Sequence, residues 1–364
     1  MNATLTTSFG LPTQTTATAF SSDGKVIAVG SDDGSVRIYE PPGLQVKKAI
    51  RGLGVSVSDV VFHAEDGCDC WIAAGKSLLH FDLSISKMIL MREDAKLIKD
   101  IEKDDEDGIN QLVLSTNRHD AHLACTADTG AIYVMDIYTK EVTRMKASHS
   151  SIAWTAAFIP DRPNELVTGG YDCTLLLFDF KLGTLLTRLE LSPAPSLAPG
   201  ISSLPPFVTS LAVSLQGIIA AGTADGRIWV GLGGEKVPAG SGKKKKFRKW
   251  GGLSEEDGFF TKIEENMISA LNFVSPDKLV SCSLHGKIAL HHLVRANRSS
   301  SEGQQNGLRT AWTIQSGACS KVDMLSFHAE CFALAGLHKD QKRGVVEFWT
   351  LARDEEGPDI MSSA

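Results

Sequence analysis

The fold is decided by Thr18-Ala19-Phe20-Ser21-Ser22-Asp23, which is followed by Ile27-Ala28-Val29-Gly30 and by Asp33-Gly34-Ser35-Val36-Arg37-Ile38-Tyr39-Glu40. Apolar side chains alternate along these segments, as they do in β-strands with one buried face. The pair Asp33-Gly34 stands between the second and third segments, and glycine supplies the positive φ that a tight hairpin turn needs. The stretch therefore predicts three antiparallel strands joined by short turns.

The same pattern returns in order along the whole chain. Six further copies have first strands that begin at Val60, Gln111, Ala156, Ser210, Ala270 and Met324. A unit of this size cannot bury a core alone, so the units must stack around a common axis. The sequence therefore predicts an all-β fold, a single seven-bladed β-propeller.

The spacing of the copies also predicts the blade boundaries. We expect blades near 16–50, 56–92, 108–147, 151–191, 207–263, 267–315 and 321–351. Outer, fourth strands are expected at 46–50, 88–91, 142–146, 185–191, 259–263 and 311–314. No such strand follows the seventh unit, so residues 4–9 are predicted to pair with the last blade and close the ring, which removes exposed sheet edges. The propeller domain then spans residues 1–355.

Length and composition agree with one ring. The 364 residues suit seven blades of roughly 40–45 residues each. A formal net charge of −6 argues against a general nucleic-acid binder. The seven cysteines have no framework spacing, which indicates reduced thiols. No secretory signal or long apolar segment is apparent, so we expect a soluble protein of the cytoplasm or nucleus, with no membrane contact.

Three insertions interrupt the repeats, at 192–206, 233–258 and 296–307. Their low-complexity composition predicts disordered surface loops, and residues 356–364 are expected to form a disordered tail.

The second insertion carries a basic run, followed by acidic residues at 255–257. Its cationic residues are Lys243, Lys244, Lys245, Lys246, Arg248 and Lys249. Three interpretations stay open: a nuclear-localisation signal, a contact with RNA or an acidic partner, and a solvated loop. The flanking Phe247 and Trp250 favour a contact, because exposed aromatic rings stack on bases. A phosphate-binding P-loop is excluded, because Lys244 stands where Ser or Thr must follow Gly242-Lys243.

Several residue pairs in the chain suggest chemical sites. Cys68-Asp69-Cys70 resembles half of a metal site, but no second Cys/His pair follows at zinc spacing. His291 and His292 are neighbours on one strand, so their side chains point to opposite faces. No Ser/His/Asp arrangement is supported by the spacing. We therefore expect no enzyme, with no catalytic, cofactor-binding or metal-binding residues and no cofactor.

The ends of the third strands carry an aromatic or apolar residue followed by an acidic one. These pairs are Tyr39-Glu40, Phe81-Asp82, Met135-Asp136 and Phe178-Asp179. In this respect the chain resembles the WD-repeat family. The fourth blade keeps most of that family's polar network, formed here by His149, Thr168 and Asp172, with Phe178 in place of the usual Trp. The resemblance implies buried hydrogen bonds that fasten a turn to a strand.

A closer resemblance is to the WD repeat-containing protein 53 group, best from Ala127 through His149-Ser150 to Asp172. It implies a non-catalytic scaffold for protein partners, a monomeric ring within a larger complex. More narrowly, it implies a substrate receptor that docks on the adaptor of a cullin-4 ubiquitin ligase through a Trp-Asp-x-Arg pattern. The nearest match is Phe178-Asp179-Phe180-Lys181, so Asp179 and Lys181 are the candidate docking residues. An ordinary blade end remains the alternative, because lysine lacks the planar fork of arginine.

A second function stays open. The lysine-rich loop could serve a nuclear ribosome-assembly or chromatin-associated WD-repeat factor, with binding that weakens as ionic strength rises. Nucleic-acid contact is not expected elsewhere on this acidic chain.

Overall fold

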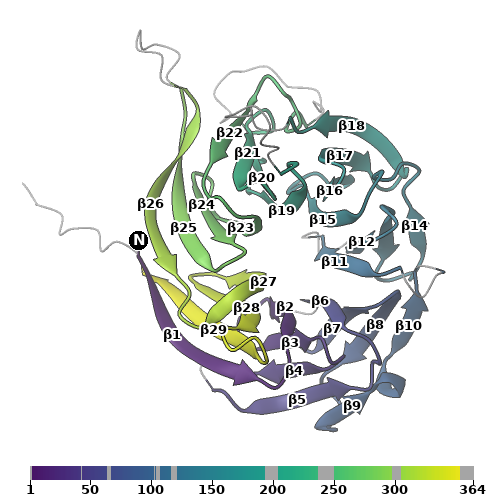
Figure 1. The fold of residues 1–364 in the computed structure, drawn as a ribbon. Coiled ribbons are helices and arrows are strands. Elements are labelled where there is room, and N and C mark those ends of the chain that lie inside the picture. Colours follow the sequence, from purple (N-terminus) through teal and green to yellow (C-terminus); the bar gives the residue numbers. More distant parts are fainter. Residues whose placement is uncertain are drawn as a thin grey trace, which may run out of the picture.

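The computed structural model describes residues 2–41, 43–63, 67–101, 103, 107–115, 121–192, 204–236, 250–296 and 305–352. Within these ranges, seven sheets surround a central axis (Figure 1). This arrangement confirms the predicted seven-bladed propeller. The one helical segment in the described ranges is the short η1 (Arg92–Asp94), and no helix there could cross a membrane.

Each blade is a meander whose first strand lines the axis and whose fourth lies on the rim (Figure 1). Blades 1 and 2 contain β2 (Thr15–Phe20), β3 (Ile27–Ser31), β4 (Val36–Tyr39) and β5 (Val46–Arg51), then β6 (Val57–Phe62), β7 (Asp69–Ala74), β8 (Ser77–Asp82) and β10 (Leu97–Asp100). Blades 3 and 4 contain β11 (Ile109–Leu114), β12 (His122–Ala127), β13 (Ile132–Asp136) and β14 (Val142–Arg144), then β15 (Ala153–Phe158), β16 (Glu165–Gly170), β17 (Thr174–Asp179) and β18 (Thr184–Glu190). Blades 5 and 6 contain β19 (Val208–Val213), β20 (Ile219–Thr223), β21 (Arg227–Gly231) and β22 (Gly258–Lys262), then β23 (Ile268–Ser275), β24 (Lys278–Ser283), β25 (Lys287–Val294) and β26 (Gly307–Gln315). Blade 7 contains β27 (Cys319–His328), β28 (Cys331–His338), β29 (Gly344–Ala352) and β1 (Asn2–Leu11).

The two chain ends close the ring, as the sequence predicts. β1 pairs antiparallel with β29, with Phe9 opposite Val346 and Leu11 opposite Gly344. Leu11 is buried, and the Phe9 ring lies 4.9 Å from the ring of Tyr39 in blade 1. The N-terminal strand therefore completes blade 7 and also contacts blade 1.

The prediction that residues 88–91 form the outer strand of blade 2 is wrong. β9 (Ile89–Met91) instead pairs in parallel with β5 and becomes a fifth strand of blade 1. Leu90 on β9 is fully buried in the core shared by blades 1 and 2. The outer position of blade 2 is taken by β10, which pairs with β8. β9 is more apolar than β10, and it is β9 that packs onto the neighbouring blade 1.

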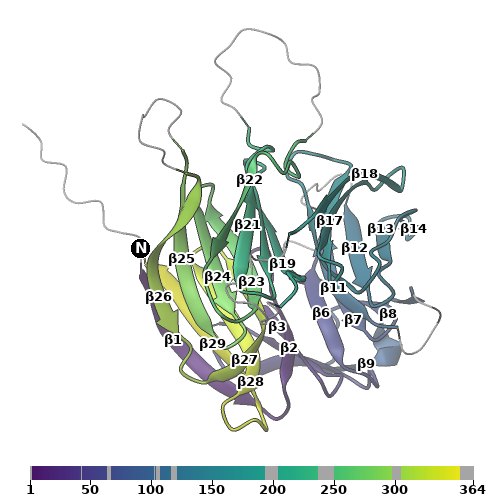
Figure 2. The ribbon, with the colours of Figure 1, turned by 45° about the horizontal axis from the view of Figure 1, so that its top comes forward.

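Because adjacent strands are antiparallel, the connections divide between two faces of the ring. We name the face with the turns between strands one and two and between strands three and four the turn face. The linker face carries the turns between strands two and three and the connections between blades. Figure 2 shows the ring tilted, with the blade walls between the two faces. The core lies mostly between neighbouring blades; one cluster, for example, joins Ala28 of blade 1 to Val57 and Ile72 of blade 2.

Candidate functional site

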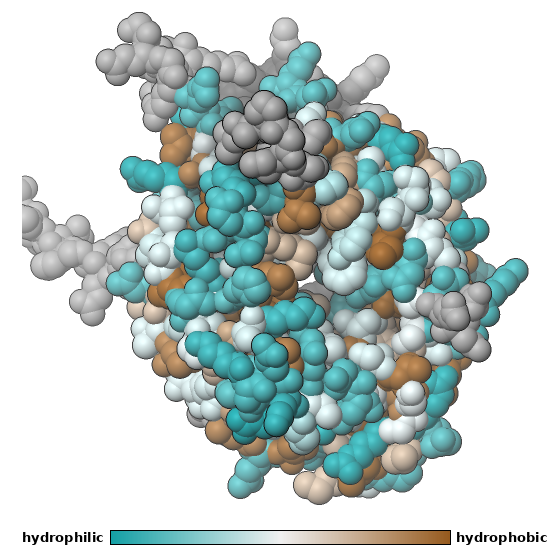
Figure 3. All heavy atoms as spheres, in the orientation of Figure 1, coloured by the Kyte–Doolittle hydropathy of each residue, from teal (hydrophilic) through white to brown (hydrophobic). Residues whose placement is uncertain are grey.

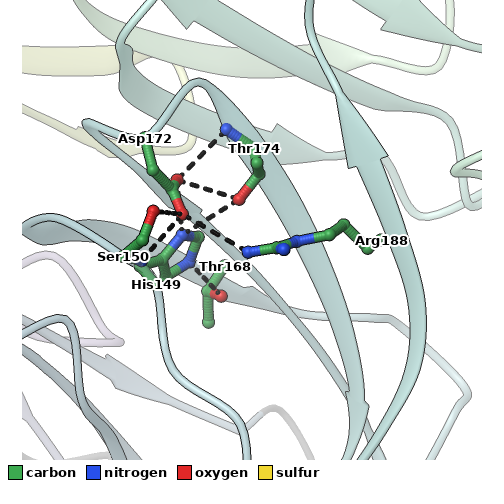
Figure 4. Close-up of polar contacts among 6 residues, drawn as sticks. All are labelled: His149, Ser150, Thr168, Asp172, Thr174 and Arg188. Atoms are coloured by element: carbon green, nitrogen blue, oxygen red, sulfur yellow. Dashed lines mark hydrogen bonds and ion pairs between the residues drawn. The ribbon is translucent and has the colours of Figure 1, made fainter.

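The polar network of blade 4 joins a turn on the linker face to the preceding interblade connection (Figure 4). His149 Nδ1 donates to Asp172 Oδ1 at 2.8 Å, and its Nε2 lies 2.9 Å from Thr168 Oγ1 on β16. The carboxylate of Asp172 also accepts the backbone N–H of Ser150 at 3.0 Å and the hydroxyl of Thr174 at 2.8 Å. Phe178 is fully buried on β17 and has no polar group to join these bonds.

Charge and burial compete at Asp172, whose side chain is 4% exposed. Burial alone would raise its pKa, but the hydrogen bond and charge of His149, with the bonds from Ser150 and Thr174, outweigh burial and hold the pKa below its ordinary value. The ionised carboxylate therefore stabilises the fold at neutral pH. This contribution is lost as pH falls below the ordinary carboxylate range near about 4.

Asp172→Ala is expected to lower the free energy of unfolding by about 3 kcal/mol, because it leaves buried donors without their acceptor. Urea denaturation at pH 7 measures the change. The matched control is Asp340→Ala, which removes a carboxylate from the corresponding turn of blade 7. Asp340 is 35% exposed and pairs with Arg343 at 2.6 Å, so its loss should cost much less than the loss of Asp172. Equal losses in the two variants would contradict the role given to the buried network.

Two other blades fasten the same turn with arginine in place of histidine. In blade 5, Arg227 Nε donates to Asp225 Oδ2 at 2.6 Å, and its guanidinium lies 4.1 Å from the ring centroid of Phe260. In blade 1, Arg37 donates to the Ser35 hydroxyl at 2.8 Å. Neither set is among the residues predicted from the sequence. The sequence feature that indicates both sets is an arginine shortly after an Asp-Gly pair.

Blade 6 has a buried histidine on β25 that bonds to the neighbouring strands β24 and β26 and not to this turn. His291 is fully buried, with Nε2 2.8 Å from Ser281 Oγ and Nδ1 3.0 Å from Thr310 Oγ1. Burial lowers the pKa of His291 to about 4, so the ring is neutral at pH 7. His292 points to the other side of the strand and is half-buried. The two histidines therefore do not face a common ligand.

The innermost strands share a β-bulge just inside the linker face. In every blade one register shift falls at a residue that faces the axis, namely Thr16, Ser58, Asn110, Trp154, Thr209, Ser269 and Asp323. A bulge leaves backbone groups unpaired and re-aims a side chain. All seven residues line a central cavity of about 320 Å³, and Figure 3 shows the hollow at the centre of the ring.

Side chains at and beside the bulges connect neighbouring blades. The hydroxyl of Thr16 donates to the carbonyl of Val57, and the amide of Asn110 donates to the carbonyl of Ala153 at 3.0 Å. The carboxylate of Asp59 accepts the backbone N–H of Leu112 at 2.8 Å. The bulges therefore supply polar links around the axis that satisfy buried backbone groups.

The candidate docking residues of blade 4 lie on the turn face. Asp179 Oδ1 accepts the backbone N–H of Leu182 at 3.1 Å, which fixes the turn after β17. Lys181 lines a second cavity, of about 330 Å³, together with Asp136 and Glu141 of blade 3. Beside Lys181 in the chain, Leu182 is 65% exposed. The structure therefore places Asp179 as a support of the turn and Lys181 at a surface cleft.

The basic residues 243–249 and the tail 356–364 lie outside the described residues. Trp250 is described, and it is buried, with Nε1 donating to the carbonyl of Gly217 at 3.0 Å. The expectation that Trp250 is an exposed ring for base stacking is therefore wrong. Its indole instead anchors the end of the insertion to blade 5.

The candidate metal pair does not gather further ligands. Cys70 is fully buried and burial raises the pKa of its thiol, whereas Cys68 is half-buried in the turn before β7. Among the residues that the structure describes, no three or more His, Cys, Asp and Glu side chains form a group that could hold a metal ion.

Comparison with known proteins agrees with the geometry. The family model described as "WD domain, G-beta repeat" matches residues 7–40 and 140–179, which contain the first blade's inner strands and the polar network of the fourth. The chain is also similar to the WD repeat-containing protein 53 homolog of Dictyostelium discoideum, with 28% identity over 225 residues. That similarity covers 56% of this chain and 58% of the relative, so the chain spans less than two thirds of the relative's length. The chain is therefore a seven-bladed β-propeller, closed by both chain ends, whose first and fourth blades match the WD-repeat model.

Proposed function

We propose that the protein is a non-catalytic interaction scaffold and that its turn face docks on the adaptor of a cullin-4 ubiquitin ligase. WD-repeat propellers typically serve as scaffolds for protein interactions, although the fold alone names no partner. The observation that carries the narrower proposal is a group of exposed apolar side chains on the turn face of blades 3 to 5. Tyr138 is 60% exposed, Leu182 65% and Leu215 76%. Exposed apolar side chains that gather on one face favour a protein interface.

The charged groups near Leu182 supply specificity for this interface. Lys181 stands at the cleft with Asp136 and Glu141, so the surface combines apolar anchors with charges of both signs. Such a rim orients a partner, while the apolar anchors contribute most of the binding free energy. Lys181 would make the contact in this arrangement, and Asp179 would hold the turn that presents Lys181 and Leu182.

The double variant Asp179→Ala/Lys181→Glu is expected to abolish co-purification of the cullin-4 adaptor with the tagged protein from its own cells. Lys181→Glu and Leu182→Asp, each alone, should reduce recovery at least about tenfold, because each removes one type of contact without disturbing Asp179. The control is Met88→Asp beside β9, where the native side chain is 64% exposed, and it should leave recovery unchanged. Absence of the adaptor from the wild-type sample, or full recovery with all docking variants, would refute the proposal.

A nuclear ribosome-assembly or chromatin factor is the second candidate, supported by where the basic insertion is anchored. Lys236, just before residues 237–249, donates to the carbonyl of Leu215 at 2.8 Å, and Trp250 just after them is bound to Gly217. Both anchors lie on the turn face. In the same co-purification, deletion of residues 243–249 distinguishes a localisation signal from a contact with RNA or an acidic partner. Loss of nuclear entry alone identifies a localisation signal, whereas loss of salt-sensitive RNA or histone-chaperone binding supports this second function.

A further inference from the structure

Three aromatic rings form a continuous stack on the linker face of blades 4 and 5. The indole of Trp154 lies 5.2 Å from the Tyr171 ring, at an interplanar angle of 29°. Tyr171 in turn lies 5.3 Å from Phe207, at an angle of 20°. Trp154, at the inner end of the stack, is 37% exposed although the Tyr171 ring packs against its indole.

Trp154 stands at the mouth of the central cavity because it is the bulge residue of β15. The other six bulge positions carry side chains of Thr, Ser, Asn or Asp, so Trp154 is the one aromatic member of this ring. The cavity that they line has a volume of about 320 Å³. This space suits one extended side chain, and its lining combines Trp154 and the polar bulge residues with apolar side chains such as Leu211, Leu271 and Leu325.

An acidic group lies next to the stack. Asp128, in the linker-face turn of blade 3, accepts the side-chain amide of Asn110 at 3.0 Å and the backbone N–H of Gly108 at 3.1 Å. Asn110 is itself a bulge residue that lines the cavity. The negative charge of Asp128 also reaches Tyr171, whose pKa is raised by burial and then by this charge.

Three other carboxylates of this face have cationic partners. Asp225 is bound by Arg227, Asp323 by Lys321, and Asp172 by His149. For Asp128, by contrast, the contacts between described residues include neutral donors and no cation. Asp128 is exposed, and its amide donor Asn110 also donates to the carbonyl of Ala153, the residue before Trp154. A carboxylate near an exposed indole is a pairing that attracts a cation.

We propose that the mouth of the central channel binds an arginine side chain of a partner polypeptide, with the guanidinium against Trp154 and Asp128 as its counter-charge. Arginine fits better than lysine, because its planar group stacks on an indole face and can meet a carboxylate through two parallel hydrogen bonds. The two described residues that flank the basic insertion, Lys236 and Trp250, are bound on the opposite face, so the proposal concerns a separate polypeptide. A nucleic acid is disfavoured because its phosphates would approach the carboxylates of Asp128 and Asp323.

This site is independent of adaptor docking, which concerns the turn face. Peptide binding can therefore fail while adaptor capture succeeds, and the reverse. Where both occur, the ring would hold the ligase with one face and a basic segment of a second protein with the other.

The test uses the full-length protein and an array of peptides with a central arginine in varied sequence contexts, each paired with the same peptide carrying citrulline. Citrulline has nearly the shape of arginine but no charge, so the pair isolates the cation. We expect a subset of arginine peptides to bind at least about tenfold more tightly than their citrulline partners, and this preference should shrink as salt rises.

Variants connect this preference to the proposed residues. Trp154→Ala and Asp128→Asn should each remove most of it, Trp154→Tyr should keep part of it, and Met88→Ala should keep all of it. Thermal unfolding of each variant shows whether the ring is intact, and Trp154→Tyr retains a ring that can stack. The proposal is overturned if no arginine peptide exceeds its citrulline partner, or if the preference survives in Trp154→Ala. Trp154-dependent binding of a single-stranded oligonucleotide without arginine preference would overturn it in favour of base stacking.

Discussion

A chain that lacks residues 2–11 is expected not to form a cooperatively folded ring. β1 supplies nine paired positions to β29, and without it β29 becomes an exposed edge that can pair with other molecules. The deletion also removes buried Leu11 and the contacts of the Phe9 ring with Tyr39 and Phe348. The combined loss is comparable with the whole stability of a typical domain, about 5–15 kcal/mol.

Circular-dichroism melting and size-exclusion chromatography measure this outcome. We expect the truncated protein to aggregate or to lose its sharp transition, and a synthetic peptide of residues 1–13 to restore a folded monomer when added in trans. Two point variants on the same strand provide a scale. Leu11→Ala should cost about 2–4 kcal/mol, whereas Leu5→Ala, at a side chain that is 42% exposed, should cost less than about 1 kcal/mol. A monomeric truncated protein that melts like the wild type would contradict the role of β1 in closing the ring.

Ring closure could be predicted from the sequence because it follows from counting the strands in each repeat. Seven three-stranded units were recognisable, the seventh had no outer strand, and an alternating segment was left over at the N-terminus. Local alternation and turn chemistry are properties of neighbouring residues, so they can be read along the chain. The polar network of blade 4 could be located for a similar reason, since His149, Thr168 and Asp172 stand at recognisable places within one repeat.

Features that depend on a neighbouring blade could not be predicted in this way. β9 and β10 both alternate, and their assignment to different blades depends on where Leu90 finds a buried site. Trp250 looked exposed because it follows a lysine-rich run, yet blade 5 offers its indole a carbonyl partner. The channel ring is formed by one residue from each blade, and single bulges in separate strands carry no common sequence signal. Trp154, Tyr171 and Asp128 likewise meet only after blades 3 and 4 are assembled.

Asp59 is a buried acidic residue for which the environment opposes ionisation. It lies beside the bulge of β6 and is 4% exposed, with its carboxylate oxygens accepting the backbone N–H groups of Val60 and Leu112. Burial raises the pKa of Asp59 to about 7, and the two amide hydrogen bonds only partly offset it. In the unfolded chain the same carboxyl group titrates near about 3.9. Between these two values the native state holds a proton that the unfolded state has released.

The sign of the pH dependence follows from this difference. Where the native state binds more protons, stability falls as pH rises, so the contribution of Asp59 decreases from about pH 4 to about pH 7 and is constant above that. The full change amounts to as much as about 4 kcal/mol.

Asp59→Asn removes the titration and keeps an oxygen that can accept one of the amides. We therefore expect the free energy of unfolding of the wild type, minus that of Asp59→Asn, to fall by up to about 4 kcal/mol between pH 4 and pH 8 in urea titrations. Asp172→Asn is the matched control of opposite sign, because the pKa of Asp172 is lowered. The free energy of unfolding of the wild type, minus that of Asp172→Asn, should increase as pH rises from acid to neutral. This increase should occur at lower pH than the decrease for Asp59→Asn. If the difference in free energy of unfolding between the wild type and Asp59→Asn stays constant across this range, the carboxylate is ionised in the folded ring. The hydrogen bonds from the amides of Val60 and Leu112, the second of which joins two blades, would then offset the cost of burying its charge.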